Sequence, residues 1–398
     1  MLSNRVKNLK PSPTLALATK AKELRAQGKD VISLSVGEPD WDTFESIKKA
    51  GLIAIENGDT KYTPSNGIPD LRKAIAKVTS SETGLEFEAD EVTVSTGGKF
   101  VIFAAMQALL NPADEVLIPS PYWVSYPTQV ELAEGKPKII TTKKENNFKL
   151  APDELEKAIG KNSKLLILNS PSNPTGGMYT KEELTELSKV IAKHKDLMVL
   201  SDDIYNKLVF NPEGLAPHLL QVAPKLRDRV LIVNGVSKSY SLTGWRLGWA
   251  LGPKEVIVAM TRYQSQSVSC VPGFVQKAAL QAIEGGEAEL KNAVAKLKRR
   301  RDFAFELFKG LSHVDVECPD GAFYIWPDFG YFIGKSWKEK KIKNSRDLAG
   351  GLLEDQMVAA VPGIEFGAEG YLRISYALSE DKMTEAVSRI RAFLSELK

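Results

Sequence analysis

The chain has few of the residues that build disulfide frameworks, thiolate metal sites or histidine-based active sites. Its 398 residues include two cysteines and three histidines. The cysteines are too few and too far apart for a disulfide framework or a thiolate metal site. The histidines do not have the HExxH spacing of zinc hydrolases, so neither metal catalysis nor a histidine triad is expected. These residues are Cys270, Cys318, His194, His218 and His313.

Long hydrophobic runs and a strong net charge are also missing. The longest apolar run, residues 100–110, is too short to span a bilayer, and the N-terminus lacks the apolar core of a signal peptide. The net charge is only +3. The basic stretches 296–301 and 338–343 lack interleaved aromatic residues that would stack on bases. We expect a cytoplasmic protein that binds neither membranes nor nucleic acids.

Apolar runs of strand length alternate with helical patterns over most of the chain. Strands that alternate with helices predict an α/β fold, here a large and mostly parallel sheet of seven strands flanked by helices. The predicted strands are residues 92–95, 116–118, 139–141, 165–168, 197–200, 230–233 and 248–251.

The pattern changes after about residue 275, which predicts a second and smaller α/β or α+β unit. It begins with a long charged helix over residues 287–308. Short strands are expected around 314–317 and 322–325, and a closing helix from Lys382. The expected division is an N-terminal arm (1–35) packed with the small domain, a large domain (36–275) and a small domain (276–398).

The stretch 237–246 places a lysine just beyond an apolar run and an arginine eight residues later. Because residues 230–233 are a predicted strand, Lys238 follows its carboxyl end, where open α/β sheets bind ligands. Lysine there is suited to forming a Schiff base with an aldehyde, and Arg246 to binding an anion. A solvated Lys-Ser turn explains these ten residues equally well, so both interpretations stay open at this point.

Small or rigid residues follow two other predicted strands. After 92–95, Gly97 and Gly98 open an apolar helix, whose exposed N–H groups are suited to a phosphate. A tight turn is an equally good explanation of these glycines. After 165–168, Asn173 is held extended by the proline that follows it. Such strings are mostly plain turns, but the position of this one at a strand end favours a binding role.

A carboxylate ends the predicted strand 197–200, in the sequence Ser-Asp-Asp-Ile-Tyr. A charge at the end of an apolar strand requires a partner. For Asp202 that partner is either a backbone N–H in a helix cap or a cationic ring nitrogen of a cofactor. Tyr205 follows three residues later.

Taken in order, these motifs resemble those of the fold-type I pyridoxal-phosphate enzymes, specifically the class I aminotransferases. The resemblance extends from residues 10–14 to 371–376 and is greatest to the prokaryotic-type aspartate aminotransferases, subgroup Ib. It implies pyridoxal 5'-phosphate as the cofactor and a homodimer with shared active sites. The implied reaction is ping-pong transfer of the amino group from L-aspartate to 2-oxoglutarate, which gives oxaloacetate and L-glutamate.

The resemblance also implies roles for individual residues. Lys238 would hold the cofactor as a Schiff base and then move the reacting proton. Asp202 would keep the pyridine nitrogen protonated, so that the ring accepts electrons. Tyr205 and Asn173 would bind the 3-oxygen of the ring, and Trp123 would stack on the ring.

The phosphate of the cofactor would be bound by the glycine loop together with Arg246, whose guanidinium is a fixed fork of donors. Tyr62 resembles the tyrosine that reaches the phosphate of the neighbouring subunit, and residues 265–267 are expected to do likewise. The remaining residues of this group are Gly97, Gly98, Lys99 and Ser237.

Substrate recognition is implied at several places, and Trp123 and Asn173 are expected to contact the substrate as well as the cofactor. Arg373 matches the arginine that binds the α-carboxylate, with Gly37 beside it. Lys99, with the segment of Ser12 and Thr14, is associated in subgroup Ib with a distal carboxylate, which favours aspartate and glutamate. The pair of Lys99 and Thr14 also resembles the corresponding pair in subgroup members that transaminate prephenate. An aromatic or alanine-type aminotransferase, a β-lyase that uses the same cofactor, and a non-catalytic binding protein stay open as well.

The chain departs from the usual sequence motifs of the family at four positions. Asp203 replaces a common glutamate, Trp41 a phenylalanine, Phe44 a proline and Trp249 a tyrosine. The loss of the proline at position 44 matters most, because it changes the entrance segment and with it the expected closure of the domains.

Overall fold

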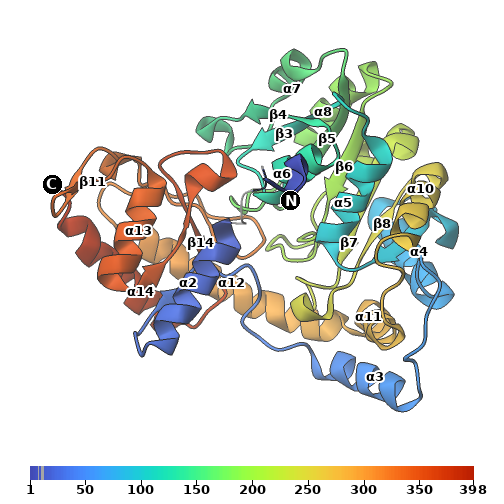
Figure 1. Ribbon diagram of the computed structural model, residues 1–398, viewed down its shortest axis with the longest axis horizontal. Coiled ribbons are helices and arrows are strands. Elements are labelled where there is room, and N and C mark those ends of the chain that lie inside the picture. The colour runs from blue at the N-terminus through green and yellow to red at the C-terminus, as the bar shows by residue number, and fades with distance from the viewer. Residues whose placement is uncertain (8, 10–12) are drawn as a thin grey trace.

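The computed structural model describes residues 1–7, 9 and 13–398. Its centre is a seven-stranded sheet with the strand order β2-β8-β7-β6-β5-β3-β4 (Figure 1). All pairs are parallel except those of β8, which runs antiparallel to both β2 and β7. All seven predicted strands are present, which confirms the mostly parallel sheet. Their bounds are β2 (Val92–Ser95), β3 (Glu115–Ser120), β4 (Lys136–Thr141), β5 (Ser163–Asn169), β6 (Met198–Asp202), β7 (Val230–Gly235) and β8 (Gly248–Leu251).

Both faces of the sheet are buried, which explains why its strands are apolar runs rather than alternating sequences. One face packs on α5, α6 and α10, and the other on α4, α8, α9 and α11. Successive strand residues, such as Leu165 and Leu166, belong to opposite faces. The helices around the sheet are α3 (Glu45–Glu56), α4 (Pro69–Thr83), α5 (Gly98–Leu109), α6 (Ser125–Leu132), α7 (Pro152–Ala158), α8 (Lys181–Lys193), α9 (Leu219–Val222), α10 (Lys254–Ser265) and α11 (Gly273–Gly285).

The rest of the chain forms a second group of elements, at the left of Figure 1, and the long helix α12 extends between the two groups. The N-terminal segment packs with this group, since β1 pairs in parallel with β12. No helix in the described part of the chain is long and apolar enough to cross a membrane. The elements of this group are α2 (Pro13–Ala26), β1 (Ile32–Ser33), α12 (Glu287–Lys309), β9 (Tyr324–Ile325), β10 (Ser336–Trp337), β11 (Lys340–Lys341), α13 (Ser345–Gln356), β12 (Val358–Ala359), β13 (Val361–Pro362), β14 (Leu372–Ser375) and α14 (Glu380–Ser395). The short helix α1 (Asn4–Lys7) lies outside this group in Figure 1.

The prediction of a strand at 314–317 is wrong. Asp315 forms only an isolated bridge with Asp328, and its own carboxylate accepts the N–H of Val316 at 3.0 Å. Such local hydrogen bonds compete with the pairing of strands. The next strand is shorter than predicted because Ala322 has φ +58°, outside the extended region. The closing helix starts at Glu380, two residues earlier than predicted.

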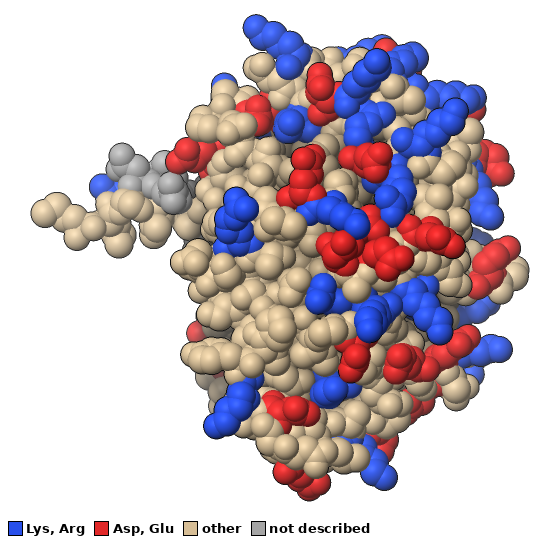
Figure 2. All heavy atoms as spheres, turned by 90° about the vertical axis from the view of Figure 1, so that its right-hand side faces the viewer, with Lys and Arg blue, Asp and Glu red and all other residues tan. Residues whose placement is uncertain are grey.

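Several residues in each of the two basic stretches are paired with acids. Figure 2 shows Lys and Arg interspersed with Asp and Glu over one face of the molecule. In the stretch 296–301, Lys298 lies 2.9 Å from Asp302, and Arg300 binds the carboxylate of Asp40. The second stretch contains the pairs Lys338–Asp355 and Lys340–Glu354.

Candidate active site

The central strands bring the predicted site residues to one edge of the sheet. Strands β5, β6 and β7 are parallel neighbours, with Asn169 opposite Asp202 and Asp202 opposite Val233. Their carboxyl ends therefore lie side by side. The loops beyond these ends carry Asn173 and Lys238. The residues that the sequence places just after successive strands therefore lie close together, at one edge of the sheet.

Asp202 is 5% exposed and has two hydrogen bonds. The hydroxyl of Tyr126 donates to Oδ2 at 2.5 Å, and the N–H of Ile204 donates to Oδ1 at 3.3 Å. Burial raises the pKa of Asp202 to about 6, although both bonds oppose that shift. A carboxyl group in this state holds a nearby proton much more firmly than a solvated aspartate does.

Lys238 follows β7 and lies close to the N-terminal segment. Its amine donates a hydrogen bond to the carbonyl oxygen of Gly37 and lies 5.9 Å from the ring centroid of Phe323. Burial, followed by the positive charge of Arg373, lowers the pKa of Lys238 to about 8. The amine is therefore much closer to neutrality at physiological pH than a surface lysine.

Tyr205 and Tyr324 form a buried pair, with 3.1 Å between their hydroxyl oxygens. Burial raises the pKa of both phenols, and for Tyr205 the shift is large. Tyr324 belongs to β9, so this contact joins the two groups of elements. The guanidinium carbon of Arg373 lies 4.3 Å from the centroid of the Tyr324 ring, which is cation–π distance.

Arg373 is 3% exposed and is held on two sides. Nη1 donates to Oδ1 of Asn173 at 3.0 Å, and Nη2 donates to the carbonyl oxygen of Ser35 at 2.9 Å. Within the described residues Nε has no hydrogen-bond partner. A buried donor without a partner is costly, so this nitrogen favours an anion in the adjacent space.

A second cationic corner lies at the start of α5. Gly97 has φ +87°, and a Cβ built there would lie 2.5 Å from Nη2 of Arg246, so only glycine lets the guanidinium approach the loop. A Cβ at Gly248 would likewise lie 2.6 Å from the N–H nitrogen of Gly98. The guanidinium of Arg246 and the start of α5 therefore lie together, an arrangement suited to an anion.

Lys99 and Trp123 lie together at this corner. The Lys99 amine is 5.1 Å from the centroid of the Trp123 ring, and Trp123 packs edge-on against Tyr126 at 5.3 Å. Desolvation of the amine, followed by the charge of Arg246, lowers the pKa of Lys99. Trp123 and Tyr126 also line a cavity that extends to Asn173.

The other predicted site residues have less defined surroundings. Ser237, next to Lys238, is buried, whereas Tyr62 is 93% exposed on this chain. Thr14 lies in the first turn of α2, but its side chain is outside the described part of the structure, as is all of Ser12. The structure therefore leaves the roles predicted for these four residues as predictions.

Comparison with known proteins decides the family. The family model described as aminotransferase class I and II matches residues 29–390. The chain belongs to this family. The aminotransferase is 45% identical to the "Probable aspartate/prephenate aminotransferase" of Rickettsia felis, over 98% of this chain and 95% of that protein. It is also 45% identical to the "Aspartate/prephenate aminotransferase" of Cereibacter sphaeroides, over 100% and 99% of the two chains.

Solved structures agree with this assignment. The aspartate aminotransferase from Rhizobium meliloti superposes with a TM-score of 0.95 at 41% identity, with full coverage of both chains. The enzyme from Thermus thermophilus with maleate gives a TM-score of 0.92 at 40% identity and 99% coverage of each chain. These likenesses confirm the predicted α/β fold and the predicted family.

Aminotransferases of this family use pyridoxal 5'-phosphate, and the residues of this aminotransferase fit that cofactor. Lys238 supplies an amine whose pKa is lowered to about 8, and Asp202 supplies a buried carboxyl group whose pKa is raised. Gly97 leaves room for the guanidinium of Arg246 beside it. The unpartnered Nε of Arg373 suits the carboxylate of an amino acid. Arg246 is thus suited to the phosphate of the cofactor, and Arg373 to the carboxylate of the substrate.

Sequence reasoning missed two residues of the aminotransferase site. Tyr126 binds Asp202, and Tyr324 lies between Tyr205 and Arg373. Tyr126 lies three residues after Trp123 in the sequence Pro-Tyr-Trp-Val-Ser-Tyr (121–126), which carries no further local signal for its role. Tyr324 has no local signal, because its partners are 119 and 49 residues away in sequence.

Proposed function

We propose that this aminotransferase moves the amino group of L-aspartate to 2-oxoglutarate in a ping-pong reaction that gives oxaloacetate and L-glutamate. The observation that carries the proposal is the buried Arg373, whose Nε is unpartnered. It faces the same site as the amine of Lys238, whose pKa its charge lowers. A dicarboxylate substrate would then place its second carboxylate near Lys99. The names of the relatives, aspartate/prephenate and aspartate aminotransferases, support this choice.

The proposed cofactor contacts follow from the positions of the side chains. Asp202 would bind the ring nitrogen, and its raised pKa favours a shared proton there. Tyr205 and Asn173 would bind the 3-oxygen of the ring, and Trp123 would cover one face. The phosphate would be bound by Gly97, Gly98, Lys99, Ser237 and Arg246.

The bound cofactor supplies an aldehyde that receives the amino group and a ring that accepts electrons. The chain supplies the proton transfer and the orientation. With a pKa near 8, the Nζ of Lys238 is suited to take a proton from the substrate and to return it. Arg373 would fix the α-carboxylate by a bidentate contact, with Gly37 closing the other side.

The distal carboxylate of the substrate is the basis of the first prediction. Replacing Lys99 by alanine is expected to lower kcat/KM for aspartate by about 10- to 100-fold, because a charge-assisted hydrogen bond is lost. When rates are expressed per bound cofactor, so that the lost phosphate contact of Lys99 does not count, turnover of alanine, which has no distal carboxylate, is expected to change little. Stopped-flow half-reactions with aspartate, glutamate, alanine, phenylalanine, tyrosine and arogenate measure this for both proteins.

The same panel of substrates separates the competing reactions. If arogenate reacts as fast as aspartate, the protein is also a prephenate aminotransferase. Release of ammonia without an acceptor oxo acid would point to a β-lyase. An unchanged preference for aspartate in the Lys99→Ala protein would refute the role of this lysine.

We also propose a homodimer. Helix α3 exposes Leu52, Ile53 and Ile55, and Tyr62 follows a short distance along the chain. Exposed apolar residues grouped on one helix are typical of a subunit interface. The proposed division at residues 35 and 275 and a cytoplasmic location belong to the same proposal; the latter is supported by the free thiols of Cys270 and Cys318.

The second prediction tests the shared site. In a dimer, Tyr62→Phe removes a hydrogen bond to the phosphate of the neighbouring subunit and is expected to weaken cofactor binding by about 3- to 10-fold. The protein should still elute at the mass of a dimer in light scattering. Equal cofactor affinity of the two proteins, or a monomeric wild type, would contradict the proposal.

A further inference from the structure

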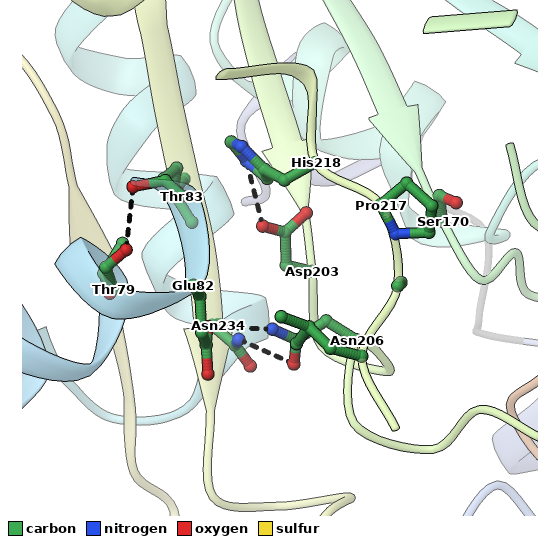
Figure 3. A pocket seen from close by; sticks show the side chains of 12 residues that line it. Thr79, Glu82, Thr83, Ser170, Asp203, Asn206, Pro217, His218 and Asn234 are labelled. Atoms are coloured by element: carbon green, nitrogen blue, oxygen red, sulfur yellow. Dashed lines mark hydrogen bonds and ion pairs between the residues drawn. The ribbon is translucent and has the colours of Figure 1, made fainter. Parts of the chain in front are cut away.

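A second buried carboxylate follows Asp202 directly in the chain. Asp203 is 7% exposed and lines a cavity of about 20 Å³ together with side chains from α4, β7 and the segment before α9 (Figure 3). Such a volume holds about one water molecule. Asp203 therefore belongs to the far side of the strand end, away from the proposed cofactor contact of Asp202.

Ser201 and His218 face the carboxylate of Asp203. The hydroxyl of Ser201 donates to Oδ1 at 2.7 Å, and Nε2 of His218 lies 3.2 Å from Oδ2, within ion-pair distance but without the geometry of a hydrogen bond. Figure 3 shows the imidazole directed at the carboxylate. His218 is itself buried, so the pair is shielded from solvent.

The orientation of the His218 ring is fixed by its other nitrogen. Nδ1 accepts the N–H of Leu220 at 3.0 Å, as the cap of helix α9. Since Nδ1 is occupied as an acceptor, Nε2 is the ring nitrogen that faces Asp203.

The other charges around the cavity are balanced. Glu82, on the opposite wall, lies 2.9 Å from the amine of Lys207 and accepts a hydrogen bond from Asn206 at 3.2 Å. Within the described residues, His218 is the one basic side chain at ion-pair distance from Asp203. Burial is the main cause of the raised pKa values of Asp202 and Tyr126, and the negative charge of Asp203 raises both further.

We propose that Asp203 and His218 are positioning residues of the cofactor site. Asp203 adds a second negative charge behind Asp202 and so strengthens the hold of that carboxylate on the protonated ring nitrogen, while His218 holds the Asp203 side chain in place. The inference rests on the proposed contact between Asp202 and that nitrogen. Asp203 and His218 themselves would contact neither the substrate nor the cofactor.

The test compares variants that remove the charge or its partner with variants that retain them. Asp203→Asn and His218→Leu are expected to lower kcat per bound cofactor about tenfold, the factor that corresponds to one pKa unit at the ring nitrogen. They should also raise the dissociation constant of pyridoxal 5'-phosphate, with KM for aspartate within twofold. Asp203→Glu and His218→Gln should restore most of kcat. Thr79→Val is the matched control, because Thr79 lines the same cavity without contacting the pair.

Each outcome decides the matter. The spectrum of the bound cofactor, titrated with pH, should shift in the two disruptive variants and stay unchanged in Thr79→Val. Loss of thermal stability with normal kcat per bound cofactor would show a purely structural pair and overturn the proposal. If Asp203→Asn does not fold, the comparison of His218→Leu with His218→Gln decides alone. A wild type that binds no cofactor would refute the proposed function instead.

Discussion

Replacing Lys238 by alanine is expected to abolish transamination, with a fall in kcat of at least about 10⁴-fold. The reason is that the amine proposed to exchange protons with the substrate is lost together with the covalent attachment of the cofactor. The visible absorption of the attached cofactor should disappear as well. Stopped-flow half-reactions with aspartate and absorption spectra of the dialysed protein measure the two effects separately.

A surface lysine provides the control for this experiment. Lys254 is largely exposed and pairs with Asp90 at 2.8 Å, so Lys254→Ala should keep both activity and absorption. An unchanged visible spectrum in the Lys238→Ala protein would remove the assignment of this lysine, and with it the proposed reaction.

Loss of the buried arginine should have the second largest effect. Arg373→Leu is expected to lower kcat/KM for every amino-acid substrate by about 10²- to 10⁴-fold, because two charge-assisted hydrogen bonds to the α-carboxylate are lost. The pKa of Lys238 should rise, since the charge of Arg373 now lowers it. Initial rates over a range of pH values give both quantities.

Two further variants make this prediction specific. Arg373→Lys keeps the charge but not the planar fork, so it should recover part of the pKa shift and little of the substrate binding. Arg346→Leu removes an exposed arginine paired with Glu365 and should leave kcat/KM unchanged. Equal losses for aspartate and for a substrate amine without a carboxylate would contradict the role of Arg373.

The sequence was most informative where the local pattern decides the structure. A strand buried on both faces must be apolar throughout, so β7 and its neighbours were visible as continuous runs. Residues just beyond such runs must lie at one edge of a parallel sheet. For that reason Asn173, Asp202 and Lys238 were found together before any contact was known.

Contacts across long sequence distances were not predictable in the same way. Tyr324 reaches Tyr205 from a short strand whose start depends on the left-handed backbone of Ala322, and no periodicity encodes that. His218 is directed at Asp203 because it also caps a four-residue helix. Such a helix is too short to be recognised from a repeating pattern.

The two anchors of Arg373 have a consequence for the cost of binding. An arginine free in solution loses side-chain entropy when it grips a carboxylate, typically about 0.5–1.5 kcal/mol. Here Asn173 and the carbonyl of Ser35 already immobilise the guanidinium in the absence of substrate. That entropy is lost during folding instead, so the substrate meets a preorganised fork. Weakening an anchor, as in Asn173→Ala, would therefore move the ordering cost from folding into each binding event.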